Sequence, residues 1–176
     1  GLGRSAWSRQ LLSAVLQTRL PLVVDADALN LLALDPDNRE NWIITPHPGE
    51  AGRLLGQRAA EIQQDRFAAV HALVDRYGGT AVLKGAGSLV CTTDRPVAVC
   101  TVGNPGMATA GMGDVLTGVI AALVAQGLSL PDAAILGVCL HGQAGDRAAV
   151  AGERGLLARD LIDELRHVIN AQGETA

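Results

Sequence analysis

Three short apolar runs, separated by segments with helical spacing of apolar residues, restrict the fold more than any other feature of this chain. The runs cover residues 22–24, 43–44 and 80–83, which is the length of buried strands rather than helices. Parallel strands need crossover connections, and these are usually helical. Residues 88–92 and 97–102 alternate around a turn, which predicts a hairpin at the sheet edge. The sequence therefore predicts an α/β fold whose mostly parallel sheet is covered by helices on both faces.

Helical patterns fill most of the remaining chain. Helices are expected over residues 5–19, through 54–55, and over 60–77, 111–126, 131–149 and 158–170. The apolar run 115–130 ends at Pro131, short of the ~20 residues that a membrane span requires, so we interpret it as a buried helix. The charged residues between Gln57 and Arg66 are interpreted as a solvated helix face.

Composition argues against several classes of protein. The chain has 176 residues and a formal net charge of -4, so it lacks the basic stripe of a nucleic-acid-binding protein. Its three cysteines form no C-x-x-C pair, which argues against a zinc site or a disulfide framework and favours a reducing cytoplasm. The sequence presents no signal peptide and no membrane span, and we expect residues 1–176 to form a single domain.

Polar residues follow each of the three predicted parallel strands. They are Asp25, Asp27 and Asn30 after the first strand, residues 45–50 after the second, and residues 84–88 after the third. The carboxyl ends of parallel strands lie at the same edge of a sheet, and ligands of such sheets bind there. The sequence therefore predicts a binding site at this edge before any motif is considered.

A glycine-rich segment, residues 103–114, runs directly into the apolar helical pattern that begins at Val115. Glycines before a helix permit a tight turn and leave backbone N–H groups pointing outward, and the helix dipole adds partial positive charge. Such a segment predicts an anion pocket. Asp114 lies in the first helical turn, where it either caps the helix or accepts a proton from a substrate hydroxyl that attacks a bound phosphoryl group.

Four motifs follow one another in order. They are Val-Asp-Ala-Asp-Ala-Leu-Asn (24–30), Thr-Pro-His-Pro-Gly-Glu (45–50), Val-Leu-Lys-Gly-Ala-Gly (82–87) and the segment 104–118. Together they resemble the ADP-dependent NAD(P)H-hydrate dehydratases, a family of the ribokinase-like superfamily, and the resemblance runs from Gly1 almost to the C-terminus. It implies a lyase that repairs the S epimer of hydrated NADH and NADPH. In this family ADP phosphorylates the hydrate hydroxyl, and loss of phosphate then restores NAD(P)H.

The resemblance also assigns roles to individual positions. Asp114 would act as the base and contact the hydrate, together with Gly3 and His47. A histidine that merely bonds to the backbone of its own turn is the alternative for His47, and Lys84, the only lysine, could equally be solvated. The residues that would bind ADP, and later AMP, are Lys84, Gly85, Ala86, Gly87, Ser88 and Gly113.

Mg²⁺ is the expected metal cofactor, and Glu50 is its candidate ligand. Sugar and vitamin kinases of the superfamily often have Asn after Thr-Pro and a magnesium-associated Glu three positions later. Here His47 takes the place of the Asn and Glu50 keeps the acidic place, which favours the dehydratase over a plain kinase. Asp25, Asp27 and Asn30 could either orient magnesium or a water, or cap the following helix.

The resemblance further implies that the N-terminal strands of the family's domain are missing before Gly1, and that an epimerase domain often precedes them. An exposed sheet edge and apolar face favour pairing, so we expect a homo-oligomer. The chain alone is expected to keep most nucleotide contacts and to be weakly active or inactive. Two other functions stay open, a ribokinase-like kinase of a vitamin or sugar hydroxyl and a nonenzymatic nucleotide-binding module.

Overall fold

The computed structural model describes residues 2, 3 and 5–170 and alternates strands with helices over most of its length. In chain order its elements are α1 (Ala6–Leu16), β1 (Leu22–Val24), α2 (Asp27–Leu34), β2 (Trp42–Ile44), α3 (Pro48–Leu55), α4 (Ala59–Gln64), α5 (Arg66–Tyr77), β3 (Thr80–Leu83), β4 (Leu89–Thr92), β5 (Arg95–Val99), η1 (Pro105–Met107), α6 (Met112–Ala125), α7 (Leu130–Ala148), η2 (Ala149–Ala151) and α8 (Ala158–Ile169).

The strands form one sheet in the order β1-β2-β3-β4-β5. β1, β2 and β3 are parallel, with Val23 opposite Ile43 and Ile43 opposite Thr80. β4 and β5 form an antiparallel hairpin at the other end of the sheet, because only a short turn joins them. The predicted parallel strands and the edge hairpin are both confirmed, but the second hairpin strand is Arg95–Val99 instead of residues 97–102.

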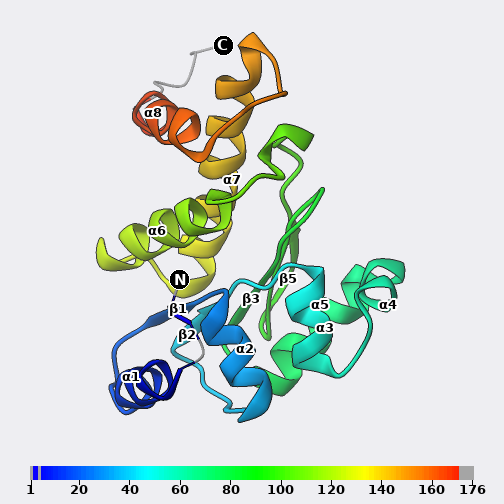
Figure 1. Ribbon diagram of the computed structural model, residues 1–176, viewed down its shortest axis with the longest axis vertical. Coiled ribbons are helices and arrows are strands. Elements are labelled where there is room, and N and C mark those ends of the chain that lie inside the picture. The colour runs from blue at the N-terminus through cyan, green and yellow to red at the C-terminus, as the bar shows by residue number, and fades with distance from the viewer. Residues whose placement is uncertain (1, 4, 171–176) are drawn as a thin grey trace.

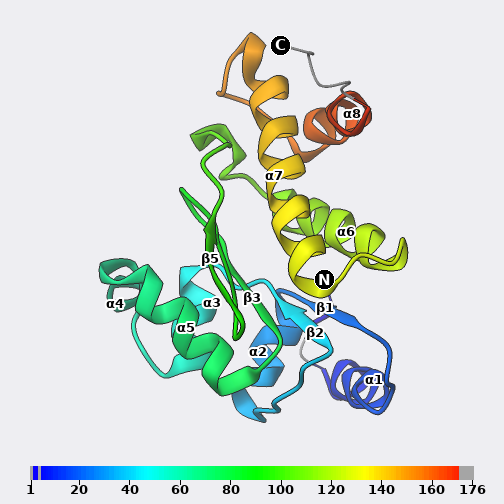
Figure 2. The same cartoon turned by 180° about the vertical axis from the view of Figure 1, so that it is seen from behind.

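Helices cover both faces of the sheet, as predicted (Figures 1 and 2). Successive strand residues point to opposite faces, so Ile44 and Leu83 join a core with α2, α3, α4 and α5. Ile43 and Val82 join a second core with α6 and α7 on the other face. Figure 1 also shows α7 and α8 extending beyond the sheet, where α8 packs on α7 and on the start of α6.

The helix expected over residues 60–77 is two helices, so that prediction is wrong at its centre. The helix is interrupted at Asp65, which has a non-helical backbone with φ -141° and ψ 85°. The Asp65 carboxylate accepts a hydrogen bond from the Ala68 N–H at 2.9 Å. Asp at a helix start satisfies N–H groups that otherwise lack a partner, so this residue begins α5 instead of continuing α4.

The apolar run after residue 114 is helical but only half buried, which corrects the prediction of a buried helix. In α6 the buried residues are Met112, Leu116 and Ile120, spaced along one side, whereas Ala121 and Ala122 are exposed. The reason is geometric, because the sheet and α7 cover only one side of this helix. None of the helices in the described part of the chain is long and apolar enough to cross a membrane.

The other edge of the sheet is β1, which pairs only with β2 among the described strands. Helix α1 precedes it and contributes little to the core, since Ser8 is its one buried residue and Trp7 is 65% exposed. All three cysteines are free thiols, and Cys91 and Cys100 are buried.

Candidate functional site

A cleft of about 1040 Å³ lies where the carboxyl ends of the parallel strands meet the start of α6. Asp25 follows β1, His47 follows β2 and Lys84 follows β3, and all three residues line the cleft. Parts of the glycine-rich segment, residues 103–114, line it as well. The predicted convergence of the polar clusters at one edge of the sheet is confirmed.

Most of the residues predicted for the site lie in this cleft. Those that line it are His47, Lys84, Gly85, Ala86, Gly87, Ser88, Gly113 and Asp114. Glu50 and Gly3 are not lining residues. The N–H of Gly3 donates to Asp27 Oδ2 at 2.8 Å, so Gly3 binds the junction of β1 and α2. Gly1 lies outside the described residues.

The start of α6 leaves Asp114 available to a ligand. The N-cap residue is Gly111, whose φ of 88° lies in the left-handed region that favours glycine. No side chain of the described residues caps this helix, and Asp114 is exposed in its first turn. Of the two interpretations of Asp114, the capping role is therefore wrong, and the carboxylate stands at the cleft beside backbone N–H groups and the positive helix end.

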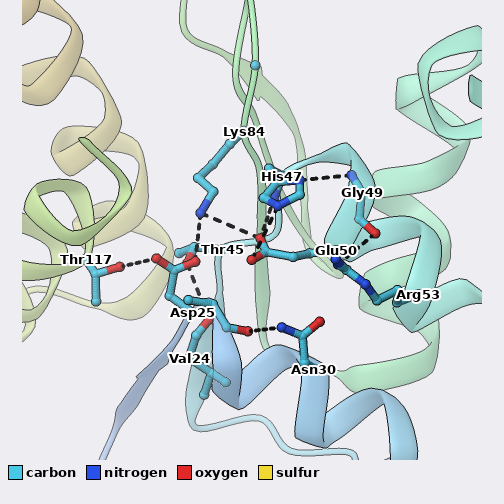
Figure 3. A network of polar contacts seen from close by, with 12 residues as sticks. Val24, Asp25, Asn30, Thr45, His47, Gly49, Glu50, Arg53, Lys84 and Thr117 are labelled. Carbon is cyan, nitrogen blue, oxygen red and sulfur yellow. Dashed lines mark hydrogen bonds and ion pairs between the residues drawn. The ribbon is translucent and has the colours of Figure 1, made fainter. Parts of the chain in front are cut away.

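Lys84 is neither solvated nor a free ammonium (Figure 3). Its Nζ lies 2.7 Å from Asp25 Oδ1 and 3.8 Å from Glu50 Oε2, and the side chain is only 18% exposed. The second oxygen of Asp25 accepts a hydrogen bond from the Thr117 hydroxyl of α6 at 3.0 Å. The network therefore ties the ends of β1 and β3 to α6 and offsets most of the Lys84 charge.

His47 forms the turn that starts α3, as one of its two interpretations predicted. Its Nδ1 accepts from the Gly49 N–H at 3.0 Å, and its own N–H donates to Glu50 Oε2 at 2.9 Å. Because Nδ1 accepts a hydrogen bond, the proton of the neutral ring is on Nε2, 3.5 Å from Glu50 Oε1. Half of the side chain is exposed and lines the cleft, so the ring can also contact a ligand.

The described residues do not form a magnesium site of their own. Within residues 2, 3 and 5–170, no group of three or more His, Cys, Asp or Glu side chains is placed to hold a metal ion. Two carboxylates at this edge of the sheet already have partners. Asp25 is paired with the Lys84 ammonium, and Glu50 contacts both that ammonium and the His47 N–H. The role of Glu50 as a magnesium ligand stays a prediction.

The junction of β1 and α2 is strained where it borders the cleft. Ala26 has φ 51° and ψ -117° and is the only non-glycine residue of the described chain with positive φ. Such conformations cost about 1–3 kcal/mol and concentrate at functional sites. Asn30 donates to the Ala26 carbonyl at 3.2 Å, and no side chain caps α2, so the capping alternative for Asp25, Asp27 and Asn30 is wrong.

Two residues that sequence analysis missed support the loops of the cleft. Arg66 donates to the Leu83 carbonyl at 3.1 Å and also to the Ala86 carbonyl, so its interpretation as part of a solvated face is wrong. Asp146 accepts from the Gly103 N–H at 2.9 Å and from the Asn104 side-chain amide at 3.0 Å. Both residues act across 17 to 43 positions of sequence, and no local pattern signals such contacts.

His141 borders the cleft as a buried, hydrogen-bonded residue of α7. Its Nε2 lies 3.0 Å from the Met112 carbonyl, so this nitrogen carries the proton and donates. Burial lowers the pKa of His141 to about 4, with the positive charge of Lys84 acting in the same direction against the hydrogen bond to Met112. The imidazole is therefore neutral at pH 7, and His141 is a core histidine whose Nε2–H has a hydrogen-bond acceptor.

Parallel strands that end in a glycine-lined cleft, beside the N-terminus of a helix, define an α/β protein suited to binding an anionic ligand. Residues 1–167 match the family model described as NAD(P)H-hydrate dehydratase. The chain therefore belongs to the NAD(P)H-hydrate dehydratase family, and its sheet and helices have the ribokinase-like arrangement of the solved dehydratases.

Relatives and solved structures agree with this assignment. The chain is 57% identical to the bifunctional NAD(P)H-hydrate repair enzyme Nnr of Coxiella burnetii, covering 97% of this chain and 35% of that protein. It is 43% identical to the ADP-dependent (S)-NAD(P)H-hydrate dehydratase of Neisseria meningitidis, covering 97% and 61%. The ADP/ATP-dependent NAD(P)H-hydrate dehydratase of Bacillus subtilis, co-crystallised with ATP/Mg²⁺, superposes with a TM-score of 0.84 at 28% identity, covering 96% and 61%. The chain thus spans about a third of the bifunctional relative and under two thirds of the others.

Proposed function

We propose that this chain provides the dehydratase site for repair of hydrated NADH and NADPH. The reaction converts the S epimer of the hydrate to NAD(P)H and is driven by cleavage of ADP to AMP and phosphate. One observation supports this function most strongly. An exposed carboxylate, Asp114, and the loop of residues 84–88 line a single cleft at the start of α6. A phosphoryl donor and a hydroxyl acceptor could therefore meet there.

ADP is proposed to bind between the loop of residues 84–88 and the start of α6. At Gly113 an added Cβ would lie 3.4 Å from Lys84 Nζ and 3.5 Å from Asp25 Oδ2, which are ordinary contacts. Packing within the chain thus leaves room for a methyl group at this position, and a glycine there is consistent with close approach of a ligand. Because Asp25 pairs with Lys84, we expect backbone N–H groups to make most of the phosphate contacts.

Asp114 is proposed to act as the general base. It would take the proton of the hydrate hydroxyl while that oxygen attacks the β-phosphorus of ADP. A new P–O bond forms, the bond from the β-phosphorus to the bridging oxygen breaks, and AMP leaves with the electron pair. In the second stage the C–O bond of the phosphorylated hydrate breaks, phosphate leaves, and the neighbouring ring carbon releases a proton to form the double bond of NAD(P)H. His47, on the cleft wall, is proposed to orient the hydrate.

Several properties of the whole protein belong to this proposal. An epimerase domain in the parent chain is consistent with the bifunctional relatives. A homo-oligomer is consistent with the exposed Trp7 of α1. A cytoplasmic location is consistent with the free thiols. Mg²⁺ is proposed to accompany the nucleotide, because the Bacillus subtilis dehydratase was co-crystallised with ATP/Mg²⁺ and the described residues build no metal cage of their own.

The decisive experiment incubates the parent chain with ADP and chemically hydrated NADPH and follows the absorbance of the reduced nicotinamide. Return of that absorbance, with AMP and phosphate formed in equal amounts, is the expected result. A phosphorylated product that accumulates without the absorbance would instead identify a kinase. Nucleotide binding without any turnover by the parent chain would identify a nonenzymatic binding module. The 176-residue chain is assayed in parallel, with weak or no turnover expected.

A further inference from the structure

The loop of residues 84–88 is bound by a second cation, Arg66, in addition to the lysine at its start. Arg66, the first residue of α5, donates from Nη2 to the Leu83 carbonyl at 3.1 Å. Its Nη1 donates to the Ala86 carbonyl. A Cβ added at Gly85 would lie 3.2 Å from Nη2. One planar guanidinium therefore bridges the residue before the loop and the middle of the loop, and it occupies the space that a side chain at Gly85 would need.

The charge of Arg66 is not offset in the way that the charge of Lys84 is. Lys84 is paired with Asp25 at 2.7 Å, whereas no carboxylate of the described residues lies within 4.0 Å of the Arg66 guanidinium. Arg66 Nε is buried and has no hydrogen-bond partner among the described residues. Burial lowers the pKa of Arg66, yet an arginine stays protonated in proteins. The unpaired positive charge beside this loop thus comes from Arg66.

The bonds of Arg66 also determine which backbone groups the loop can offer. Arg66 is not among the residues that line the cleft, so the carbonyl oxygens that accept from its guanidinium do not turn their negative ends toward an anion in the cleft. A loop whose carbonyls are held in this way repels a phosphate less and keeps its N–H groups for the ligand. Guanidinium suits this role because its donors have a fixed planar arrangement, which an ammonium lacks.

We propose that Arg66 is the positioning residue of the nucleotide-binding loop, and that it supplies the uncompensated positive charge that attracts the diphosphate. This inference rests on the proposed function, because it takes ADP as the ligand of the loop. It extends that function because a residue that does not line the cleft would determine the geometry of the loop and supply much of the positive electrostatic potential there.

Calorimetric titration of ADP into the 176-residue chain tests the inference without requiring turnover. Arg66→Ala should raise the Kd for ADP at least about tenfold, because hydrogen bonds to a charged group are among the stronger ones in proteins. Arg66→Lys keeps the charge but cannot bridge both carbonyls, so an increase of about threefold is expected. Arg76→Ala, on the same helix, removes an exposed arginine that stacks on Tyr77, and should leave the Kd within about twofold.

Two further measurements distinguish positioning from a general loss of stability. Added guanidinium at low millimolar concentration should recover part of the ADP affinity of Arg66→Ala and none in Arg76→Ala. In the nucleotide-free proteins, the amide chemical shifts of residues 85–88 should change in Arg66→Ala and stay unchanged in Arg76→Ala. Thermal unfolding establishes that each variant is folded, and if Arg66→Ala does not fold, Arg66→Lys decides.

The outcomes separate this inference from the function on which it rests. Wild-type affinity for ADP in Arg66→Ala, or in Arg66→Lys where that variant decides, would overturn the inference and leave the proposed function standing. No ADP binding by the wild-type chain would overturn the nucleotide part of both proposals. In that case, changed amide shifts in Arg66→Ala would still support the positioning of the loop, and unchanged shifts would overturn that as well.

Discussion

The two loops of the cleft are supported by side chains of opposite charge. Arg66 binds carbonyl oxygens at the loop of residues 84–88, whereas Asp146 binds the N–H of Gly103 and the amide of Asn104 in the glycine-rich segment. A cation behind a loop engages carbonyls and leaves N–H groups for an anion. A carboxylate that binds a loop accepts hydrogen bonds from N–H groups, so those groups are not free to bind an anion. The first loop is therefore suited to binding, while the second is anchored to α7 and places α6 with Asp114.

The two regions also differ in how they respond to pH. Arg66 stays charged across the whole range in which proteins are folded. The glycine-rich segment leads into α6 at Met112, whose carbonyl accepts from the neutral, buried His141. A fall in pH therefore acts at His141, beside the start of α6, and leaves the charge of Arg66 at the loop of residues 84–88 unchanged.

The largest expected effect is on turnover, and it separates catalysis at the start of α6 from nucleotide binding at the loop of residues 84–88. In the full-length parent, Asp114→Asn should lower turnover by about a thousandfold or more, because amide cannot take the hydroxyl proton. AMP binding should stay within about threefold, since the glycine segment and the helix start are unaltered. Turnover is followed by the return of reduced-nicotinamide absorbance and binding by calorimetry. Loss of AMP binding together with turnover would point to a structural role for Asp114.

The second effect is a loss of stability in acid that originates at His141. Its pKa is about 4 in the folded chain and about 6.5 when unfolded, so the unfolded state binds more protons between these values. The free energy of unfolding should fall as pH decreases from 6.5 to 4, by on the order of 3 kcal/mol from this residue. Urea unfolding across this range measures the slope.

Two variants assign that slope to its source. His141→Gln lacks the titrating ring, so the part of the slope between pH 6.5 and 4 that comes from His141 should disappear. His167→Gln changes an exposed histidine of α8 and should retain the wild-type slope. An unchanged slope in His141→Gln would refute the assignment.

A third effect reverses the pattern expected for Arg66. Asp146→Ala leaves the Gly103 N–H and the Asn104 amide without their acceptor, so the free energy of unfolding should fall by about 2 kcal/mol. The Kd for ADP should change less than about threefold. Asp146→Asn, which keeps one acceptor oxygen, should lie between the two in urea unfolding. If Asp146→Ala had normal stability and weak ADP binding, the proposed distinction between the two loops would be wrong.

The smallest effect concerns the strained residue at the edge of the cleft. Ala26→Gly should raise the free energy of unfolding by up to about 1 kcal/mol, because glycine adopts positive φ without strain. Ala28→Gly, inside α2, serves as the matched control and should lower it by about 1 kcal/mol. Thermal unfolding of both variants checks the pair, and a loss of stability in Ala26→Gly would contradict the strain argument.

The positions of Asp25, His47 and Lys84 at one edge of the sheet could be predicted because the geometry of parallel strands dictates them. The glycine segment before α6 was equally clear, since glycine density followed by an apolar helix has few other interpretations. The break at Asp65 was missed because a capping aspartate inside a helical pattern differs little from a surface residue. Only the fold shows that Lys84 pairs with Asp25, 59 positions away.

The sequence by itself determined most of the order of strands and helices, the edge at which the site lies, and the carboxylate at the start of α6. These features follow from local periodicity and from rules that hold for every parallel sheet. The tertiary structure alone decided which charges are offset, which backbone groups are used, and which face of α6 is covered. Those properties depend on contacts between residues far apart in the chain, and the free energy of such contacts depends on distance and burial, which no run of neighbouring residues specifies.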